Sequence, residues 1–300
     1  MATLLPTWTS AVALAMKDQV IIQGHRGCRG LMPENTIPGF LHALELGLNT
    51  LELDVVVSAD NHLILSHEPY LNADICTFPD GGRLSPEEGE LINIYRMTSA
   101  NAAKFDCGSL GSPDFPAQKK ISAHKPLLKE LCDALRQFCK SYNYAFPFLN
   151  IELKSRPQWY DCYQPEPARY IEIVKDELEA AGLKEGFSLQ SFDFAVLREI
   201  HTALPDTLII CLNETPAKSM ENCFAELGFI PWGYSQFFEQ ADASLVKRCR
   251  ESNVLLSVWT VNSAQDASRL LDAGVRNIIT DYPDRMLTLL EEKGFELFRY

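Results

Sequence analysis

The sequence has no low-complexity tract, no apolar run long enough for a membrane span, and few basic residues. The apolar stretch Leu4 to Met16 follows no basic residue, is interrupted by Pro6 and is too short to cross a bilayer, so we expect a packing segment there. Its 27 Lys and Arg against 40 Asp and Glu give a net charge of −13. Because nucleic-acid backbones are bound by clustered basic side chains, we expect neither nucleic-acid binding nor stable membrane insertion.

The nine cysteines include no CxxC pair and no Cys/His spacing of a zinc site. An odd number without such spacing favours reduced thiols over a disulfide framework. We therefore expect a reducing compartment, the cytoplasm. The alternative is a periplasmic or secreted protein from which a signal peptide has been removed.

The residues that are present, 46% hydrophobic and 22% charged over 300 positions, are typical of a globular chain. Apolar and β-branched runs predict eight strands, at 20–23, 50–57, 148–154, 187–191, 207–212, 233–238, 254–260 and 277–280. Eight helical segments alternate with them, at 36–48, 127–142, 166–181, 194–203, 217–227, 241–252, 264–273 and 284–293. The alternation predicts an α/β fold, a (β/α)8 TIM barrel, with residues 1–300 as a single domain.

The second unit of the barrel carries an extra segment. About 60 residues rich in Gly, Pro, Asp and Ser separate its strand from its helix. We expect a small insertion over residues 69–125, leaving the barrel at the face where active sites lie, since βα loops leave there. Its favoured role is a cap over the substrate, and the alternative is an excursion that touches no ligand.

Acidic side chains interrupt two apolar strands. Glu52 and Asp54 in LELDVVV share one face of a strand, roughly 6 to 7 Å apart, and Glu152 in FLNIELKS lies on the next strand. Carboxylates about 5 Å apart repel by roughly 3 kcal/mol, so a divalent cation is expected among them, and oxygen ligands favour Mg²⁺ or Ca²⁺ over Zn²⁺. The alternative, that Glu52 and Asp54 point into solvent, is weakened because helices cover the outer face of a barrel.

The stretch GHRGCRG places His25 and Arg26 among glycines directly after the first strand. The glycines let the backbone approach a ligand closely, and the strand end delivers both side chains to the barrel rim. His67 ends a short return segment, ADNHLILSHE, that we expect at the same rim. Cleavage of a phosphodiester needs a base, an acid and positive charge, which the two histidines, a metal, Arg26 and Lys154 would supply. The other four histidines, expected to be solvated or structurally hydrogen-bonded, are His42, His62, His124 and His201.

Six stretches occur in order along the chain: GHRG with PENT, ELDV, HE, NIELK, WTVN and ITDYPD. Together they resemble the signatures of the glycerophosphodiester phosphodiesterase family over nearly all of residues 20–285. The resemblance implies a TIM barrel with an inserted cap and one divalent cation, Ca²⁺ or Mg²⁺. It implies hydrolysis of glycerophosphodiesters, such as glycerophosphocholine or glycerophosphoethanolamine, to sn-glycerol 3-phosphate and an alcohol. Attack by the substrate's own 2-hydroxyl group through a cyclic phosphate is implied too, with the acid and base histidines in either order.

The resemblance also assigns residues. It implies metal ligands Glu52, Asp54 and Glu152, an acid/base pair His25 and His67, phosphate-binding Arg26 and Lys154, supporting Glu34 and Asn35, and Trp259 near the glycerol. One departure is Glu68, which follows the second histidine where the family often has Asp. The residues alone leave an alternative for Trp259, which could be a packed core residue rather than part of the pocket. Asp281 could simply cap the last helix.

Two other functions keep the same barrel. A phospholipase D-like enzyme acting on lysophospholipids or sphingolipids would need an exposed apolar surface beside the site, and no loop has an obvious cluster of large apolar residues. A non-catalytic phosphate-ester-binding barrel would not need the full set of catalytic groups. We expect a small-molecule substrate as the partner, and a monomer or a homodimer.

Overall fold

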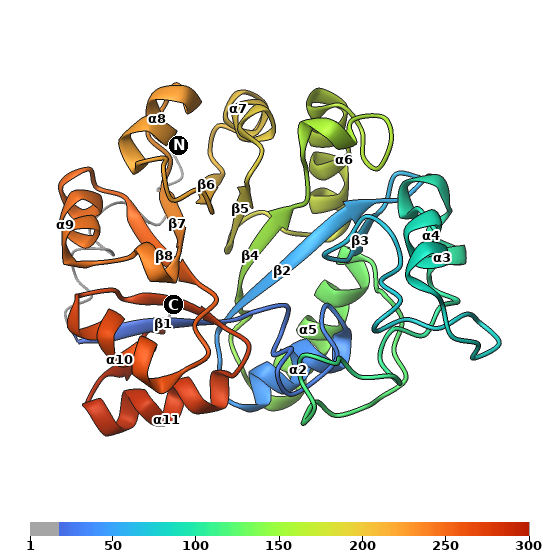
Figure 1. The fold of residues 1–300 in the computed structure, drawn as a ribbon, viewed down its shortest axis with the longest axis horizontal. Coiled ribbons are helices and arrows are strands. Elements are labelled where there is room, and N and C mark those ends of the chain that lie inside the picture. Colours follow the sequence, from blue (N-terminus) through green and yellow to red (C-terminus); the bar gives the residue numbers. More distant parts are fainter. Residues whose placement is uncertain (1–17, 300) are drawn as a thin grey trace.

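The computed structural model describes residues 18–299, so the packing segment expected at Leu4 to Met16 lies outside the described residues. Eight parallel strands form a closed barrel in the order β1, β9, β8, β7, β6, β5, β4, β2, with β2 pairing back to β1 (Figure 1). Their bounds are β1 (Gln19–Gly24), β2 (Thr50–Val57), β4 (Phe148–Leu153), β5 (Phe187–Ser191), β6 (Leu208–Asn213), β7 (Gly233–Phe237), β8 (Leu255–Trp259) and β9 (Asn277–Thr280). The prediction of a (β/α)8 barrel with these eight strands is confirmed.

Helices lie between successive strands and surround the barrel (Figure 1). They are α2 (Ile37–Glu45), α5 (Leu128–Tyr142), α6 (Pro167–Ala180), α7 (Phe194–Ala203), α8 (Met220–Leu227), α9 (Ala243–Glu251), α10 (Ala264–Asp272) and α11 (Pro283–Lys293). Side-chain oxygens cap several N-termini: Asp242 accepts from the Leu245 amide and Ser263 from the Asp266 amide. All eight helices fall within the segments that the apolar periodicity predicts, give or take one or two residues at their ends.

Several short elements escape the sequence patterns. β3 (Leu63–Leu65) runs antiparallel to β2 and is the expected return segment, whereas β10 (Glu296–Leu297), parallel to β1, was not predicted. The insertion holds α3 (Pro86–Leu91), η1 (Ile94–Arg96) and α4 (Ser99–Ala102), and η2 (Pro157–Trp159) and η3 (Phe238–Gln240) lie in loops after β4 and β7. Elements of two to six residues are too short to show a period. Among residues 18–299 no helix combines the length and the apolar character needed to cross a membrane.

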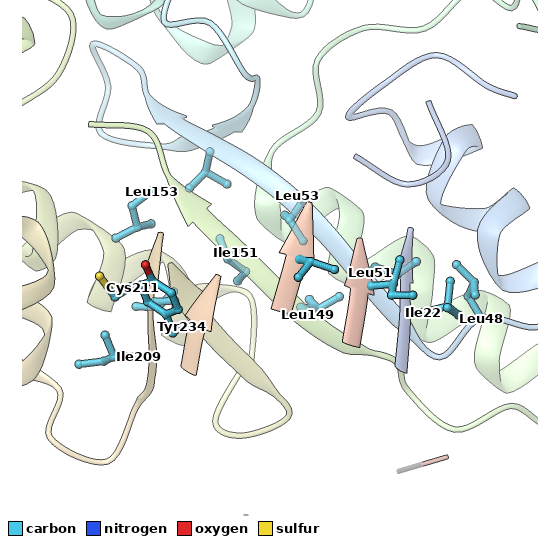
Figure 2. Packing of buried hydrophobic residues seen from close by; sticks show 14 of the residues in the cluster. Ile22, Leu48, Leu51, Leu53, Leu149, Ile151, Leu153, Ile209, Cys211 and Tyr234 are labelled. Carbon is cyan, nitrogen blue, oxygen red and sulfur yellow. The ribbon is translucent and has the colours of Figure 1, made fainter. Parts of the chain in front are cut away.

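The two faces of the barrel wall differ in chemistry. Side chains such as Leu51, Leu53 and Ile151 belong to the large apolar cluster shared with the surrounding helices and are fully buried (Figure 2). The alternate positions carry buried amides: the Asn150 amide donates to Gln23 at 3.0 Å and to Gln190 at 3.1 Å. The barrel interior below the catalytic rim is therefore polar and hydrogen-bonded, where many barrels have branched apolar residues.

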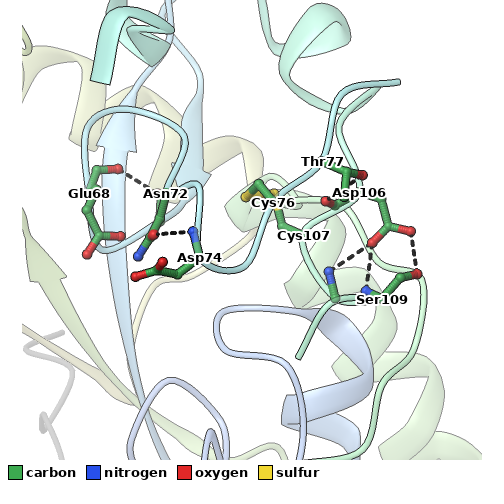
Figure 3. The surroundings of a disulfide bond; sticks show 10 residues. Glu68, Asn72, Asp74, Cys76, Thr77, Asp106, Cys107 and Ser109 are labelled. Atoms are coloured by element: carbon green, nitrogen blue, oxygen red, sulfur yellow. Dashed lines mark hydrogen bonds between the residues drawn. A yellow bond between two sulfur atoms is a disulfide. The ribbon is translucent and has the colours of Figure 1, made fainter. Parts of the chain in front are cut away.

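The insertion packs in a second, smaller apolar cluster, which also includes Val56 of β2 and Ile64 of β3. Within it a disulfide joins Cys76 to Cys107, 31 positions apart in the sequence (Figure 3). The expectation of reduced thiols throughout is wrong for these two residues, because the folded loops bring together cysteines whose spacing matches no motif. The other described cysteines are free thiols: Cys28, Cys132, Cys139, Cys162, Cys211, Cys223 and Cys249.

Candidate active site

A cavity of about 400 Å³ opens at the carboxyl ends of the barrel strands. Seven of the ten predicted site residues line it: His25, Arg26, Glu52, His67, Glu152, Lys154 and Trp259. The remaining three, Glu34, Asn35 and Asp54, contact residues that line the cavity: Glu34 and the Asn35 amide bind Arg26, and Asp54 lies 3.5 Å from Lys154 Nζ. The structure therefore brings together all ten residues at the face where TIM barrels carry their active sites.

Three carboxylates converge at the cavity, and two of them, Glu52 and Glu152, line it. β2 and β4 pair so that Asp54 lies opposite Glu152 and Glu52 lies opposite Asn150. Each of Glu52, Asp54 and Glu152 offers a carboxylate oxygen within 4.8 Å of the others, and all three side chains are buried. The period of two in LELDVVV and FLNIELKS produces this cluster, because it turns the acidic residues to the inner face of neighbouring strands.

The charges of the cluster are only partly compensated. Burial, together with the charges of Asp54 and Glu152, raises the pKa of Glu52 well above its usual range. Burial also raises the pKa of Glu152, against the opposing charge of Lys154. For Asp54, the charges of Arg26 and Lys154 outweigh burial and lower the pKa. Added positive charge beside Glu52 and Glu152 would favour their ionised forms.

The donor set fits a hard divalent cation. Lys154 Nζ lies 2.6 Å from Glu152 Oε1 and 3.5 Å from Asp54 Oδ1. Within residues 18–299, the hydrogen bonds to Glu52 come from neutral groups, the Arg26 amide at 3.1 Å and the Gln190 side chain at 3.1 Å. Three clustered carboxylates with oxygen atoms only are ligands typical of Mg²⁺ or Ca²⁺. These residues could hold one such ion.

The turn after β1 explains the glycines of GHRG. A Cβ atom on Gly24 would overlap the carbonyl oxygen of Gly27, which itself has φ of +91°. Arg26 between them also has a positive φ, of 50°, and its amide faces Glu52. The two glycines permit this tight turn, and the turn directs His25 and Arg26 to the cavity.

The PENT loop holds the first turn and the acidic cluster in place. Glu34 accepts hydrogen bonds from the Arg26 guanidinium at 3.0 and 3.2 Å. Asn35 donates to Asp54 Oδ2 at 2.9 Å and accepts from the Asp54 amide at 3.3 Å. Thr36 then caps the N-terminus of α2. Each polar residue of the loop thus has a distinct partner.

His25 is anchored by Asp281, which follows β9. The His25 Nδ1 and Asp281 Oδ1 atoms are 2.6 Å apart, and Asp281 also accepts from Arg29 Nε at 2.7 Å and from Asn262 Nδ2 at 2.7 Å. The charges of His25 and Arg29 lower the pKa of Asp281 although burial opposes them, and burial lowers the pKa of His25 to about 4. An ionised Asp281 fixes Nδ1 as the protonated nitrogen and leaves Nε2 free on the cavity side. A capping role for Asp281 is wrong, because Tyr282 occupies the N-cap of α11.

His67 is anchored by its neighbour Glu68. Its Nδ1 lies 2.7 Å from Glu68 Oε1, and the side chains of both residues border the cavity. The hydrogen bond and charge of His67 and the charge of buried Lys125 lower the pKa of Glu68 to about 2, against the effect of burial. Glu68 thus serves as the carboxylate partner of an imidazole despite the departure from Asp.

Aromatic rings line the wall opposite β2 and β4. Trp259, at the end of β8, packs edge to face against Phe192 at 5.5 Å and Phe237 at 5.7 Å between ring centroids. Its indole Nε1 is buried and has no hydrogen-bond acceptor among the described residues. Trp259 is thus a packed residue whose side chain also lines the cavity.

The sequence analysis missed several residues of the site, namely Arg29, Lys125, Gln190 and Asn262, and gave Asp281 no contact with a histidine. Asp281 and Asn262 carry a usable signal, because they lie one and two residues after predicted strands, at the face where barrel active sites lie. The histidines set aside are engaged elsewhere, as expected: His42 with Glu45, His62 with Glu177, His124 with Glu130, and His201 stacked on Phe229.

Several known proteins resemble this chain over most of its length. Residues 25–285 match the model of the glycerophosphoryl diester phosphodiesterase family. A glycerophosphodiester phosphodiesterase of Caldanaerobacter subterraneus is 27% identical over 279 residues, 93% of this chain and 100% of that protein. A Silicibacter pomeroyi crystal structure assigned to the glycerophosphoryl diester phosphodiesterases has a TM-score of 0.84 and 28% identity, covering 97% of this chain and 100% of that one. An Oleispira antarctica phosphodiesterase solved with the product sn-glycerol 3-phosphate has a TM-score of 0.72 and 19% identity, covering 93% and 99%. The chain belongs to the glycerophosphoryl diester phosphodiesterase family.

Proposed function

We propose that the protein hydrolyses glycerophosphodiesters, such as glycerophosphocholine or glycerophosphoethanolamine, to sn-glycerol 3-phosphate and an alcohol. The observation that carries the proposal is one cavity that combines a cluster of three carboxylates with two imidazoles, each tied at Nδ1 to a carboxylate of its own. The family match and the product found in the Oleispira antarctica structure support it. A cavity of about 400 Å³ suits a small molecule of this kind.

We propose that Glu52, Asp54 and Glu152 hold one divalent cation, Ca²⁺ or Mg²⁺. Such an ion, when bound, supplies positive charge to the phosphoryl oxygens. Arg26 and Lys154 would add positive charge at the same place, since both lie at the cavity and currently pair with the acidic residues. Glu34 and Asn35 would keep Arg26 and Asp54 in position.

The two imidazoles are suited to move protons because their Nδ1 atoms are occupied and Nε2 is the free nitrogen of each ring. One would take the proton from the attacking oxygen and the other would protonate the leaving oxygen. Attack by the 2-hydroxyl group of the substrate, through a cyclic phosphate, remains the proposed route. A substrate that lacks this hydroxyl should then react poorly.

We propose that the insertion over residues 69–125 acts as a cap over the substrate. Glu68 and Tyr70, where the insertion starts, line the cavity, which supports a cap that shapes the substrate site.

The Cys76–Cys107 disulfide supports the periplasmic or secreted alternative over the cytoplasm, because disulfides persist in oxidising compartments. The oligomeric state, a monomer or a homodimer, stays a prediction.

Release of sn-glycerol 3-phosphate from glycerophosphocholine, measured with added divalent cation and with EDTA, tests the proposal. We expect turnover with the cation and none in chelator. Undiminished turnover in EDTA would remove the metal from the reaction. Lysophosphatidylcholine in the same assay tests the phospholipase D-like alternative, which a clear preference for this lipid would favour. Binding without turnover under any divalent cation would favour a non-catalytic barrel.

A further inference from the structure

A second aromatic group borders the cavity, on the side of β2 and β4. Tyr70 at the start of the insertion and Trp159 in the loop after β4 both line the cavity. Tyr163 packs edge to face against both, with ring centroids 6.3 Å from Tyr70 and 6.4 Å from Trp159. The common neighbour holds two rings, which belong to loops far apart in the sequence, at one end of the cavity.

Carboxylates accompany these rings. Glu68 lines the same part of the cavity, and its Oε2 atom is buried without a hydrogen-bond donor among the described residues. Glu214 also lines the cavity, with the exposed Arg156 3.9 Å away. A buried carboxylate oxygen without a donor carries a desolvation cost that a cation beside it would offset.

The ring of Trp159 already has a cation near it. The Arg156 guanidinium carbon lies 5.6 Å from the Trp159 ring centroid, and this arginine is exposed and able to move aside. Aromatic faces next to carboxylates attract quaternary ammonium groups, which have no N–H to donate and bury their methyl groups against the rings. A polyol would instead need several hydrogen-bonding groups, and an anion would meet Glu68 and Glu214.

The other end of the cavity differs. Trp259 offers an indole N–H without an acceptor, and Phe192 and Phe237 surround it with apolar surface. A hydroxyl-bearing glycerol arm suits this end, whereas a cationic arm suits the end with Glu68. With phosphorus near the carboxylate triad between them, a diester can extend one arm to each end.

We propose that Tyr70, Trp159 and Glu68 form a subsite for a cationic leaving alcohol, so that the preferred substrates are glycerophosphodiesters of choline-like amino alcohols. The inference rests on the proposed function and names its substrate class. It also places His67, next to Glu68, on the side of the leaving oxygen.

Two esters of equal size test the subsite: glycerophosphocholine and its neutral carbon analogue, the glycerophosphoryl ester of 3,3-dimethylbutanol. For the wild type, kcat/KM should be at least about tenfold higher for the choline ester. Trp159→Leu and Tyr70→Leu should each bring this ratio closer to one, while Trp159→Phe, which keeps an aromatic face, should retain most of it. Because the ratio compares two substrates on one protein, a general loss of activity cancels.

A wild-type ratio near one, or a ratio that neither leucine substitution changes, would overturn the subsite while leaving the proposed function intact. Hydrolysis of neither ester would contradict the proposed function itself, and the subsite with it. Arg156→Gln gives a further check, because removing a competing cation beside Trp159 should raise the ratio. A fall of the ratio in this variant would show that the alcohol arm does not compete with a cation, and would contradict the subsite.

Discussion

The two histidines of the cavity are held by different parts of the molecule. His25 follows a barrel strand, its side chain is 11% exposed, and its partner Asp281 is fixed by Arg29 and Asn262 from the rim of the same barrel. His67 is 34% exposed, and its partner Glu68 is the next residue, at the entry to the insertion. One imidazole is therefore positioned by the geometry of a closed sheet, and the other by a loop.

This difference concerns positioning and not chemistry. Both imidazoles present the same nitrogen to the cavity and both have a carboxylate with a lowered pKa behind them. A buried carboxylate with several donors has one available geometry, whereas the more exposed pair of His67 and Glu68 can adjust. Removal of His25 and removal of His67 should therefore lower kcat to a similar extent. Removal of their partner carboxylates, Asp281 and Glu68, should lower kcat to different extents.

Removal of either imidazole should have the largest effect. His25→Ala and His67→Ala should each lower kcat by about 10² to 10⁴, the contribution of a positioned acid or base. His42→Ala, on the outer helix α2, is the matched control and should retain wild-type activity. A variant of His25 or His67 within a few-fold of the wild type would show that this ring transfers no proton.

Substitution of the two carboxylates that support the histidines should lower kcat by different amounts. Asp281→Asn should lower kcat by about 10²-fold, because the amide lets the His25 ring turn and leaves Arg29 without its buried partner, whereas Glu68→Gln should cost less than about tenfold. The neutral 3,3-dimethylbutyl ester is the substrate for this test, so that the proposed cation subsite does not contribute. Asp284→Asn, three residues further on, is the control for Asp281. Equal losses at Asp281 and Glu68 would contradict the distinction between the two sides.

Cation affinity of the proposed metal site should change with pH in one direction. Because the pKa values of Glu52 and Glu152 are raised, protons compete with the cation, and affinity should weaken as pH falls, approaching tenfold per unit for each proton displaced. Calorimetric titration with Ca²⁺ or Mg²⁺ between pH 7.5 and 5.5 measures this slope. Glu52→Gln should reduce the slope along with the affinity. Affinity that is independent of pH would place the ion elsewhere.

Removal of the disulfide should have the smallest effect on activity. The double substitution Cys76→Ser and Cys107→Ser loosens the insertion, so it should lower kcat/KM a few-fold through Glu68 and Tyr70 and leave metal affinity unchanged. Limited proteolysis should show earlier cleavage between residues 70 and 125 than in wild type. Replacement of the exposed Cys162 by serine is the control. Weakened metal binding in the double variant would show that the insertion supports the barrel side as well.

Much of the barrel can be predicted from the sequence because local patterns determine it. The alternation of strand and helix, and the period of two that puts Glu52 beside Asp54, are written in consecutive residues, and parallel pairing then brings Glu152 to the same face. The ordered motifs lead to the same ten site residues that the structure gathers around the cavity.

The remaining features depend on contacts between distant residues. Asp281 meets His25 across 256 positions, and the chain of amides below the triad joins residues of several strands. The Cys76–Cys107 pairing and the meeting of Tyr70 with Tyr163 depend on loops without a period. Such partners follow from the closed barrel and the folded insertion, so a single sequence without its fold does not indicate them.

The most direct test of the central claim is calorimetric titration of metal-free protein, with the turnover of glycerophosphocholine measured at each occupancy. We predict one Ca²⁺ or Mg²⁺ per chain, turnover that rises in proportion to occupancy, and loss of both in Glu152→Gln. Wild-type binding and turnover in this variant, or turnover by metal-free protein, would contradict the account.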